Sequence, residues 1–254
     1  MMRTRQAAII ELEDVAKVFG KSGSAAAFVA VEGLKLDVPE GQMLALLGKT
    51  GCGKSTIFNM IAGLTAPTSG RVRVDGADPF GQFDALRGKM AIVFQGDRLL
   101  PWRTAVQNVE LGLEMLDRPA AERRAIAMQW LETLGLAGHA HDYPHALSGG
   151  MRQRVSIARA FAVDAKILLC DEPFSALDEM TGRGLRAEFA NLVKSNNKTA
   201  VFITHSIDEA LAIGDRIVVL KRPAKVAIDH TFERIQTETD KEGIRHMIRT
   251  VLAA

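Results

Sequence analysis

Short, almost continuously apolar runs alternate along the chain with stretches that have helical periodicity. The clearest runs are residues 43–47, 90–94, 167–170, 200–204 and 216–220. Their brevity and uniform apolarity are typical of strands that are buried on both faces of a sheet. Because helical stretches separate them, the pattern predicts an α/β fold in which helices cover a parallel sheet.

The N-terminal part has a different pattern. Residues 9–15 and 29–38 alternate between apolar and polar positions, and segment 21–27, rich in Gly, Ser and Ala, separates them. Alternation with a period of two indicates a sheet with one exposed face, and small polar residues favour a turn. We therefore expect an antiparallel sheet whose strands are joined by a hairpin loop.

From about residue 103 to residue 147 the pattern is helical. Ile126, Trp130 and Leu134 recur at a spacing of four residues, and Gly135 offers a stop directly after them. This region predicts a helical subdomain that is inserted into the α/β core.

The C-terminal end of the chain is more polar and finishes in an amphipathic helical pattern. The apolar residues that share one face of this helix are Ile244, Met247, Ile248, Val251 and Leu252. Such a face binds a partner helix or a membrane surface, or it packs on its own domain. Packing on its own domain is the commoner outcome and the one that we expect.

Composition narrows the possible partners and the compartment. Lys and Arg number 32 against 30 Asp and Glu in 254 residues, so no excess of positive charge favours nucleic acid as a partner. No apolar run approaches the ~20 residues that span a bilayer, and the N-terminus up to Glu13 has no signal-peptide pattern. The chain is therefore expected to stay in the cytoplasm and to reach a membrane only through a partner. Its two cysteines, Cys52 and Cys170, are expected to be free thiols.

The segment from Gly48 to Ser55 matches the G-x-x-x-x-G-K-[ST] pattern of a phosphate-binding loop. It follows a predicted strand and precedes a helical run, which is the context that this pattern requires. Its glycines let successive N–H groups face one anion, and the helix adds its positive end. Lys54 would reach the β- and γ-phosphates, and the Ser55 hydroxyl would ligate Mg²⁺. The expected nucleotide-binding residues of this segment are Gly48, Lys49, Thr50, Gly51, Cys52, Gly53, Lys54, Ser55 and Thr56.

Two adjacent acids end the predicted strand 167–170. Asp171 and Glu172 would lie at the carboxyl edge of the sheet, where open α/β folds bind their ligands. Asp171 would hold the Mg²⁺ shell, and Glu172 would orient or deprotonate an attacking water. By themselves the acids are equally compatible with a strand that simply ends in solvated carboxylates. The phosphate loop upstream favours the catalytic interpretation.

A third motif, with the sequence LSGGMRQR, runs from Leu147 to Arg154. Ser148 is a natural N-cap, and Gly149 and Gly150 leave backbone N–H groups uncovered at the start of a predicted helix, 151–161. The motif therefore predicts a second anion-binding site.

With this motif placed before Asp171, the chain resembles the ATP-binding subunits of ABC transporters over about residues 7–222. The resemblance implies an ATPase domain of residues 7–225 with the fold of a P-loop NTPase (RecA-like). Its core would comprise residues 7–95 and 155–225, with an N-terminal antiparallel β subdomain and an inserted α-helical subdomain at about 96–154. Residues 226–254 would form a C-terminal tail with the amphipathic helix.

The resemblance also implies roles for single residues. Gln95 matches the glutamine that touches the metal or the attacking water, and His205 matches the histidine that contacts the γ-phosphate. Residues 175–178 resemble the loop that crosses the dimer interface, and Phe19 stands where the family places an aromatic ring on the adenine. The implied catalytic residues are Glu172, His205, Gln95 and Lys54, and the implied metal ligands are Ser55, Gln95 and Asp171.

In the family that this chain resembles, two subunits face each other head to tail with ATP and Mg²⁺ between them. The phosphate loop of one subunit and residues 148–150 of the other would enclose each nucleotide. Phosphoryl transfer depends on positioning and charge stabilisation, so closing the dimer would both assemble the catalyst and perform the mechanical step. The implied partners are a second ATPase subunit (most simply a second copy of this chain), membrane permease subunits and, indirectly, a solute-binding protein. The implied location is the cytoplasmic face of the cell (inner) membrane.

Residues 95–102 (QGDRLLPW), followed by residues 108–112 (NVELG), resemble the importers of nitrate, sulfonates and taurine. The groove that receives a cytoplasmic helix of the permease would be formed by Arg98, Leu99, Leu100 and Trp102. The alternative is that Leu99 and Trp102 are ordinary core residues.

Two other functions compete with import. A soluble ABC ATPase of DNA repair or translation would be marked by tandem ATPase units, a long coiled-coil insertion or a strongly basic composition, and the sequence has none of these. The ATPase of a lipid-directed or efflux system is disfavoured by the LLPW resemblance.

In the phosphate loop, Lys49 and Thr50 stand where many relatives have Pro-Ser or Ser-Ser, so Lys49 adds a charge near the phosphates.

Overall fold

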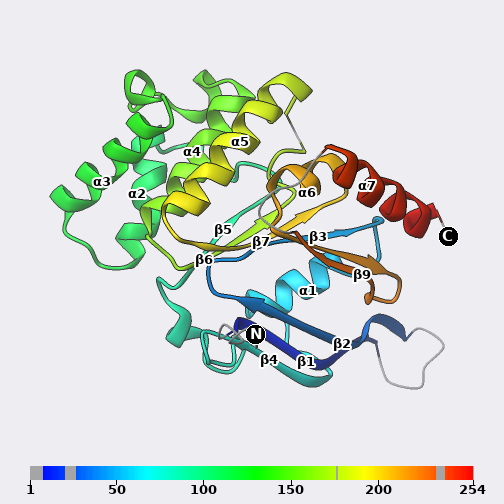
Figure 1. Ribbon diagram of the computed structural model, residues 1–254. Coiled ribbons are helices and arrows are strands. Elements are labelled where there is room, and N and C mark those ends of the chain that lie inside the picture. Colours follow the sequence, from blue (N-terminus) through cyan, green and yellow to red (C-terminus); the bar gives the residue numbers. More distant parts are fainter. Residues whose placement is uncertain (1–7, 21–26, 176, 233–237, 254) are drawn as a thin grey trace, which may run out of the picture. The chain divides into compact units, whose positions relative to one another are not determined.

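The computed structural model describes residues 8–20, 27–175, 177–232 and 238–253. They form two compact units (Figure 1). The first unit contains the described residues up to Leu86 together with those from Lys198 onward, and the second unit is Arg87–Asn197. The predicted hairpin loop 21–27, except for its last residue, and Ala176 of the predicted interface loop lie outside the described residues.

The first unit contains an antiparallel sheet with the strand order β2-β1-β4. Strands β1 (Ala8–Phe19) and β2 (Phe28–Pro39) confirm the two predicted N-terminal strands. Strand β4 (Ser69–Val74), which pairs with β1, was not predicted. Its sequence begins with Ser and Gly, and only Val72 and Val74 are buried, so it carries too little apolar alternation to be recognised.

The first unit also contains the sheet segment β7-β3-β8-β9. Strand β3 (Met43–Gly48) lies between β7 (Thr199–Thr204) and β8 (Arg216–Lys221) and is parallel to both. Every residue of β3 and β7 is buried, as the uniform apolarity of the predicted strands requires. Strand β9 (Lys225–Thr231) pairs with β8 in the antiparallel direction; it was not predicted, because it is a mostly exposed strand.

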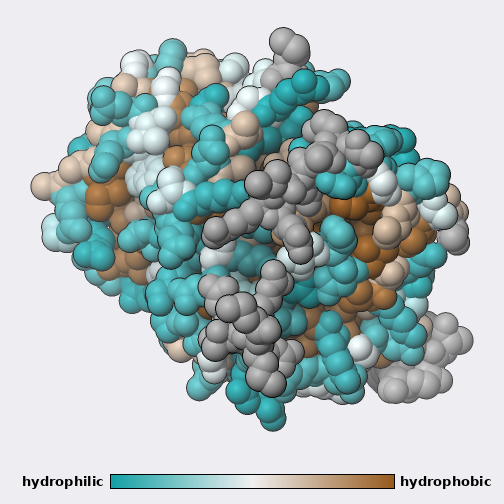
Figure 2. Space-filling view, in the orientation of Figure 1, coloured by the Kyte–Doolittle hydropathy of each residue, from teal (hydrophilic) through white to brown (hydrophobic). Residues whose placement is uncertain are grey.

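The helices of the first unit are α1 (Lys54–Ile61), α6 (Ile207–Ile213), α7 (Glu238–Ala253) and the short 3-10 helix Phe83–Leu86. Helix α7 is the predicted amphipathic helix. Its Ile244 and Ile248 are buried in one cluster with residues of β3, α6 and β8, and Arg245 pairs with Asp208 of α6 at 2.9 Å. Figure 2 shows apolar residues gathered in the region of α7 and β9. Ile244, Ile248, Val251 and Leu252 of the apolar face therefore pack on their own unit, as expected, whereas Met247 is 49% exposed.

The second unit combines a pair of parallel strands with helices. Strand β5 (Met90–Val93) pairs with β6 (Ile167–Asp171), so that Val93 lies opposite Cys170. The helices that make up the rest of the unit are α2 (Ala105–Met115), α3 (Ala120–Thr133), α4 (Gly149–Ala162), α5 (Glu179–Ser195) and the 3-10 turns Ala137–His139 and Pro144–Ala146. The helical pattern predicted for residues 103–147 is thereby confirmed.

Aromatic rings hold the helices of the second unit together. The Phe161 ring of α4 lies 5.1 Å from the ring of Trp130 on α3 and 5.9 Å from that of Phe189 on α5, measured between centroids. Phe189 in turn contacts Phe174 edge to face at 5.8 Å. Edge-to-face and tilted pairs at these separations are favourable beyond the apolar area that they bury. The three helices are therefore fixed to one another through one aromatic chain.

Both cysteines are free and buried, as predicted. Burial, together with the neighbouring Asp171 carboxylate, raises the pKa of the Cys170 thiol, so this residue stays a neutral core side chain. Within the described part of the chain, no helix has the length and apolarity that crossing a bilayer requires.

Candidate functional site

The phosphate loop connects β3 to α1, as its sequence requires. At two of its glycines a side chain has no room. A Cβ added at Gly48 would lie 2.6 Å from the Cys52 sulfur and 2.8 Å from the carbonyl oxygen of Leu220. Gly53 has a φ of +110°, and a Cβ there would lie 2.5 Å from the carbonyl oxygen of Ala30. The close turn and the left-handed backbone both depend on these residues lacking a side chain.

Lys54 opens helix α1, and its side chain is folded back along the loop. The side chain is buried, and its Nζ donates to the carbonyl oxygen of Gly48 at 2.6 Å and to that of Lys49 at 3.1 Å. Ser55 is exposed beside it, whereas the Cys52 thiol is buried beneath the loop. The loop thus presents an ammonium, a hydroxyl and backbone N–H groups together, which suits a polyphosphate with a divalent cation. Cys52 can contribute only its main chain.

Phe19 lies at the end of the β1–β2 hairpin that contacts the phosphate loop. It pairs with Phe28 across the sheet, and two residues further along β2 is Ala30, whose carbonyl oxygen approaches Gly53. The ring is 44% exposed, with the Lys17 ammonium 5.1 Å from its centroid. The Phe19 ring is half-exposed, and its strand pairs with the strand that approaches the phosphate loop, so the ring is available to stack on a base.

His205 follows β7 on a turn that is fixed by its neighbours. The Thr204 hydroxyl donates to Glu209 Oε2 at 2.6 Å in a buried hydrogen bond, and the backbone N–H of Ser206 donates to the same hydroxyl at 3.0 Å. Ser206 also caps α6 by accepting from the Glu209 N–H. The exposed His205 side chain is therefore presented from a rigid turn at the carboxyl end of a central strand.

In the second unit, Gln95 and Glu172 lie side by side. Each follows the carboxyl end of one of two paired parallel strands, β5 and β6, and Gln95 Nε2 is 3.5 Å from Glu172 Oε2. Asp171, the last residue of β6, is half-buried next to Glu172. A carboxylate with an amide beside it at the edge of a parallel sheet is suited to hold and deprotonate a water.

The backbone at Glu172 is strained. Its φ of +45° lies in the left-handed region, which a non-glycine residue adopts at a cost of about 1–3 kcal/mol. The turn after it holds this conformation, since both the N–H and the hydroxyl of Ser175 donate to the Glu172 carbonyl oxygen, at 3.2 and 2.9 Å. The two hydrogen bonds from Ser175 therefore fix the backbone that carries this carboxylate at the edge of the sheet.

Ser148 caps α4 as predicted. Its Oγ accepts from the Met151 N–H at 3.3 Å, and Ser148 and Gly149 are exposed. The predicted interface loop ends in a similar cap, because Asp178 accepts from the Thr181 N–H at the start of α5. The phosphate loop, Phe19 and His205 belong to the first unit, while Gln95, Asp171, Glu172 and the Ser148 motif belong to the second.

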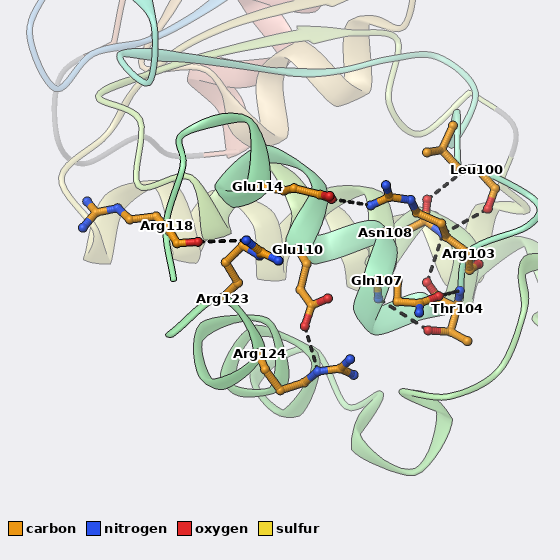
Figure 3. A network of polar contacts seen from close by, with 10 residues as sticks. All are labelled: Leu100, Arg103, Thr104, Gln107, Asn108, Glu110, Glu114, Arg118, Arg123 and Arg124. Atoms are coloured by element: carbon orange, nitrogen blue, oxygen red, sulfur yellow. Dashed lines mark hydrogen bonds and ion pairs between the residues drawn. The ribbon is translucent and has the colours of Figure 1, made fainter. Parts of the chain in front are cut away.

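The LLPW segment is pinned by a buried asparagine that the sequence indicated only as the first residue of the importer-like stretch 108–112. Asn108 on α2 is fully buried; its Oδ1 accepts from the Leu100 N–H at 2.7 Å, and its Nδ2 donates to the carbonyl oxygens of Leu100, Arg103 and Thr104 (Figure 3). Thr104 and Gln107 form a reciprocal capping box at the start of the same helix. The signal in the sequence that could have revealed the role of Asn108 is that a polar residue stands at a position of the amphipathic helix where an apolar residue is expected.

This pinned loop separates two apolar side chains that the sequence could not distinguish. Leu99 is 9% exposed and belongs to the core, whereas Trp102 is 70% exposed. The core alternative is therefore right for Leu99 and wrong for Trp102. The indole is therefore exposed on a loop whose backbone is held by the four hydrogen bonds of Asn108.

Replacing Asn108 with alanine should loosen this loop. The change leaves the part-buried Leu100 N–H and the Arg103 carbonyl oxygen without the partner that Asn108 provides, at a cost of about 1–3 kcal/mol. We expect amide exchange at residues 99–103 to become about tenfold faster or more, as measured by hydrogen–deuterium exchange mass spectrometry. Asn191→Ala, at an exposed position on α5, is the matched control. Unchanged exchange in the Asn108 variant would show that the loop is held by other contacts.

The comparisons with known proteins agree with this geometry. The ABC transporter family model matches residues 31–175. An uncharacterized ABC transporter ATP-binding protein of Methanocaldococcus jannaschii is 42% identical over 88% of this chain and 82% of its own length. The taurine import ATP-binding protein TauB of Yersinia pestis is 41% identical over 75% of this chain and 73% of its length. The nitrate import ATP-binding protein NrtC of Synechococcus elongatus is 38% identical over 88% of this chain, which spans only 34% of that protein.

One similar protein has been solved with a bound nucleotide. The dimeric post-hydrolysis structure of the ATP-binding cassette MJ0796, bound to ADP and Pi, superimposes with a TM-score of 0.77 and 34% identity, covering 89% of this chain and all of the other. The chain therefore belongs to the ABC transporter family, as a cassette that binds and hydrolyses ATP.

Proposed function

We propose that this cassette drives the import of a small solute, of the nitrate, sulfonate or taurine kind, through a membrane permease. The observation that carries the proposal is the pinned LLPW loop with its exposed Trp102. The names of two relatives, a nitrate and a taurine import protein, support the same class of solute. In this proposal the subunit sits on the cytoplasmic face of the cell (inner) membrane, and a solute-binding protein contacts it only through the permease.

The permease is proposed to bind at the Trp102 loop. A large, rigid, exposed aromatic side chain is the type of residue that dominates interface energetics, since it gains apolar contact at little conformational cost. Arg98 lies on the same segment, with its guanidinium 5.6 Å from the Phe94 ring centroid, so this segment also carries an exposed cation. A short cytoplasmic helix with an apolar face and an acidic residue fits this surface.

ATP hydrolysis is proposed to occur between two copies of the chain. The phosphate loop, with Lys54, would hold the nucleotide, and residues 148–150 of the second copy would bind the far side of its phosphates. Glu172 would take the proton of the attacking water, with Gln95 orienting that water and His205 contacting the γ-phosphate. Neither copy alone would hold a complete site, so closure of the pair would be linked to catalysis.

The donor set is suited to Mg²⁺, which prefers oxygen ligands and is usually bound by one or two protein groups together with the phosphates of the substrate. The exposed Ser55 hydroxyl beside Lys54 fits this chemistry, and the family resemblance adds the side-chain oxygens of Asp171 and Gln95. When bound, the ion neutralises charge on the phosphates. These residues are proposed as its ligands.

The first test is a pull-down of tagged chain from detergent-solubilised membranes of the native cell, with mass spectrometry of the proteins that are recovered. We expect a multi-spanning permease with the wild-type chain. Trp102→Glu should lose most of it, because a charge replaces the apolar anchor. Met115→Glu, at another residue of the second unit that is 66% exposed, is the matched control and should retain it.

Recovery of only soluble partners, of ribosomes or of DNA repair proteins would leave the ATPase intact but would overturn the transport proposal. Equal recovery of the permease by wild type and Trp102→Glu would retain transport but move the docking site elsewhere on the chain.

A further inference from the structure

We propose that Asp97, Arg152 and Arg159 form a clamp, which we call the Asp97 clamp, that makes the Ser148 helix and the Trp102 loop move as one piece. The inference rests on the proposed function, because it assigns the link between the proposed ATP contact at Ser148 and the proposed docking loop. Asp97 and the two arginines act here as positioning residues, and none of them has a chemical step in the proposed hydrolysis.

The first arm of the clamp is Arg152. Its Nε donates to Asp97 Oδ2 at 2.8 Å, and its NH1 donates to the carbonyl oxygen of Leu147 at 2.7 Å. Leu147 immediately precedes Ser148, the N-cap of α4. One guanidinium therefore ties the residue that leads into the Ser148 motif to the segment that comes after Gln95.

The second arm is Arg159, two turns further along the same helix. Its NH1 donates to the carbonyl oxygen of Arg98 and its NH2 to that of Asp97, both at 2.8 Å. Burial lowers the pKa of Arg159, and the Asp97 carboxylate opposes that effect. The group remains a cation, since arginine is not deprotonated in proteins. Two positions on α4 thus hold consecutive residues of one loop.

Asp97 also begins the docking loop. Its Oδ1 accepts from the Leu99 N–H at 3.2 Å while its Oδ2 binds Arg152, so both oxygens are used for positioning. The next residue, Arg98, has a φ of +48°, a conformation that needs support from its surroundings. From Leu99 onward the Asn108 hydrogen bonds take over. Hydrogen bonds from Leu147 through the clamp to Leu99, and from Asn108 to Leu100 and Arg103, therefore hold the backbone on both sides of Trp102.

The Asp97 clamp is better suited to transmitting a displacement of α4 to the docking loop than to stabilising the folded protein. The side chains of Arg152 and Asp97 are 35% and 29% exposed, and partly exposed ion pairs add little to the folding free energy. Their geometric effect is larger, because a displacement of the α4 N-terminus must either carry the loop with it or break charge-assisted hydrogen bonds. A nucleotide that engages Ser148 would then shift the loop that faces the permease.

The experiment measures this transmission in the purified chain, without a permease. In the Glu172→Gln background, which retains ATP, hydrogen–deuterium exchange is followed at residues 148–152 and at residues 99–104 with and without MgATP. The clamp predicts slower exchange at both segments, by about tenfold, the size that a typical coupling produces. Adding Asp97→Asn removes the charge that Arg152 binds but leaves the Arg159 hydrogen bonds to the backbone, so it should keep the protection at residues 148–152 and reduce it at residues 99–104.

A matched control is available on the same helix. Arg154 pairs with Glu188 of α5 at 2.5 Å, and both side chains are 30% exposed, but this pair does not touch the loop. Glu188→Gln should leave both responses unchanged. Asp97→Glu, which keeps the carboxylate, should restore the loop response, a rescue that a merely structural role for residue 97 does not predict.

A loop response of undiminished size in Asp97→Asn would overturn the proposal, and so would a parent protein in which residues 99–104 do not respond to MgATP. Failure of the transport proposal appears separately, as the absence of a permease in the pull-down, and does not alter the exchange experiment.

Discussion

Replacing Glu172 with glutamine is expected to lower the rate of ATP hydrolysis by about 10²- to 10⁴-fold, the range in which a positioned general base contributes. Glutamine preserves the shape of the side chain and can still accept from Gln95 Nε2, which lies 3.5 Å from the carboxylate. It cannot take a proton from the attacking water. Nucleotide binding should therefore remain close to wild type while turnover is lost.

The measurement is steady-state ATPase activity at saturating MgATP, together with ATP affinity from equilibrium binding. Glu132→Gln, at an exposed position near the end of α3, makes the same chemical change away from the site and should behave as wild type. Normal hydrolysis by the Glu172 variant would show that another group accepts the proton and that the strained backbone at this residue has a different purpose.

Replacing Lys54 with alanine should weaken ATP binding by roughly 10- to 100-fold, because a hydrogen bond that involves a charged group contributes about 1.5–3 kcal/mol. In the structure the buried ammonium is held by the carbonyl oxygens of Gly48 and Lys49, so it is already positioned within the loop. Its removal takes away the cation directed at the phosphates. Binding of a fluorescent ATP analogue, with thermal unfolding to confirm that the variant is folded, measures the effect.

Lys49 provides the matched control on the same loop. Lys49→Ala removes the same charge from an exposed position, where solvent and salt screen its field, so affinity should change by less than about threefold. If the two variants lose affinity equally, net charge near the phosphates decides binding rather than the buried position of Lys54. If neither loses affinity, the phosphate-loop assignment is wrong.

The parts of the candidate site that could be predicted from the sequence are motifs whose residues are contiguous in the chain. The phosphate loop, the acids at 171 and 172 and the Ser148 cap depend on backbone turns and helix termini that involve residues close together in the chain. The buried strands β3 and β7 were equally clear, because every residue in them is buried and their apolarity is uninterrupted. Local physics and the burial pattern were enough for these features.

Strands at the margins of the sheets were missed for the opposite reason. Strand β9 has no buried residue, and β4 has only two, so neither carries the apolar signal on which sequence patterns depend. Their backbone hydrogen bonds come from neighbours far away in the sequence, as in the pairing of Ile10 with Val74. Such a strand forms because it can pair with the edge strand of a sheet. The residues of that edge strand lie far away in the sequence, so a short stretch of sequence around the new strand does not reveal the pairing.

The sequence by itself determined the α/β class, the ATPase chemistry and the family, because each depends on residue types at short, fixed spacings. Only the tertiary structure decided that Leu99 is core while Trp102 is exposed, that Asn108 pins their loop, and that Asp97 meets Arg152 from 55 positions away. Packing chooses between side chains of equal hydrophobicity, and a hydrogen bond needs its donor and acceptor at one point in space. Neither condition is encoded by spacing along the chain.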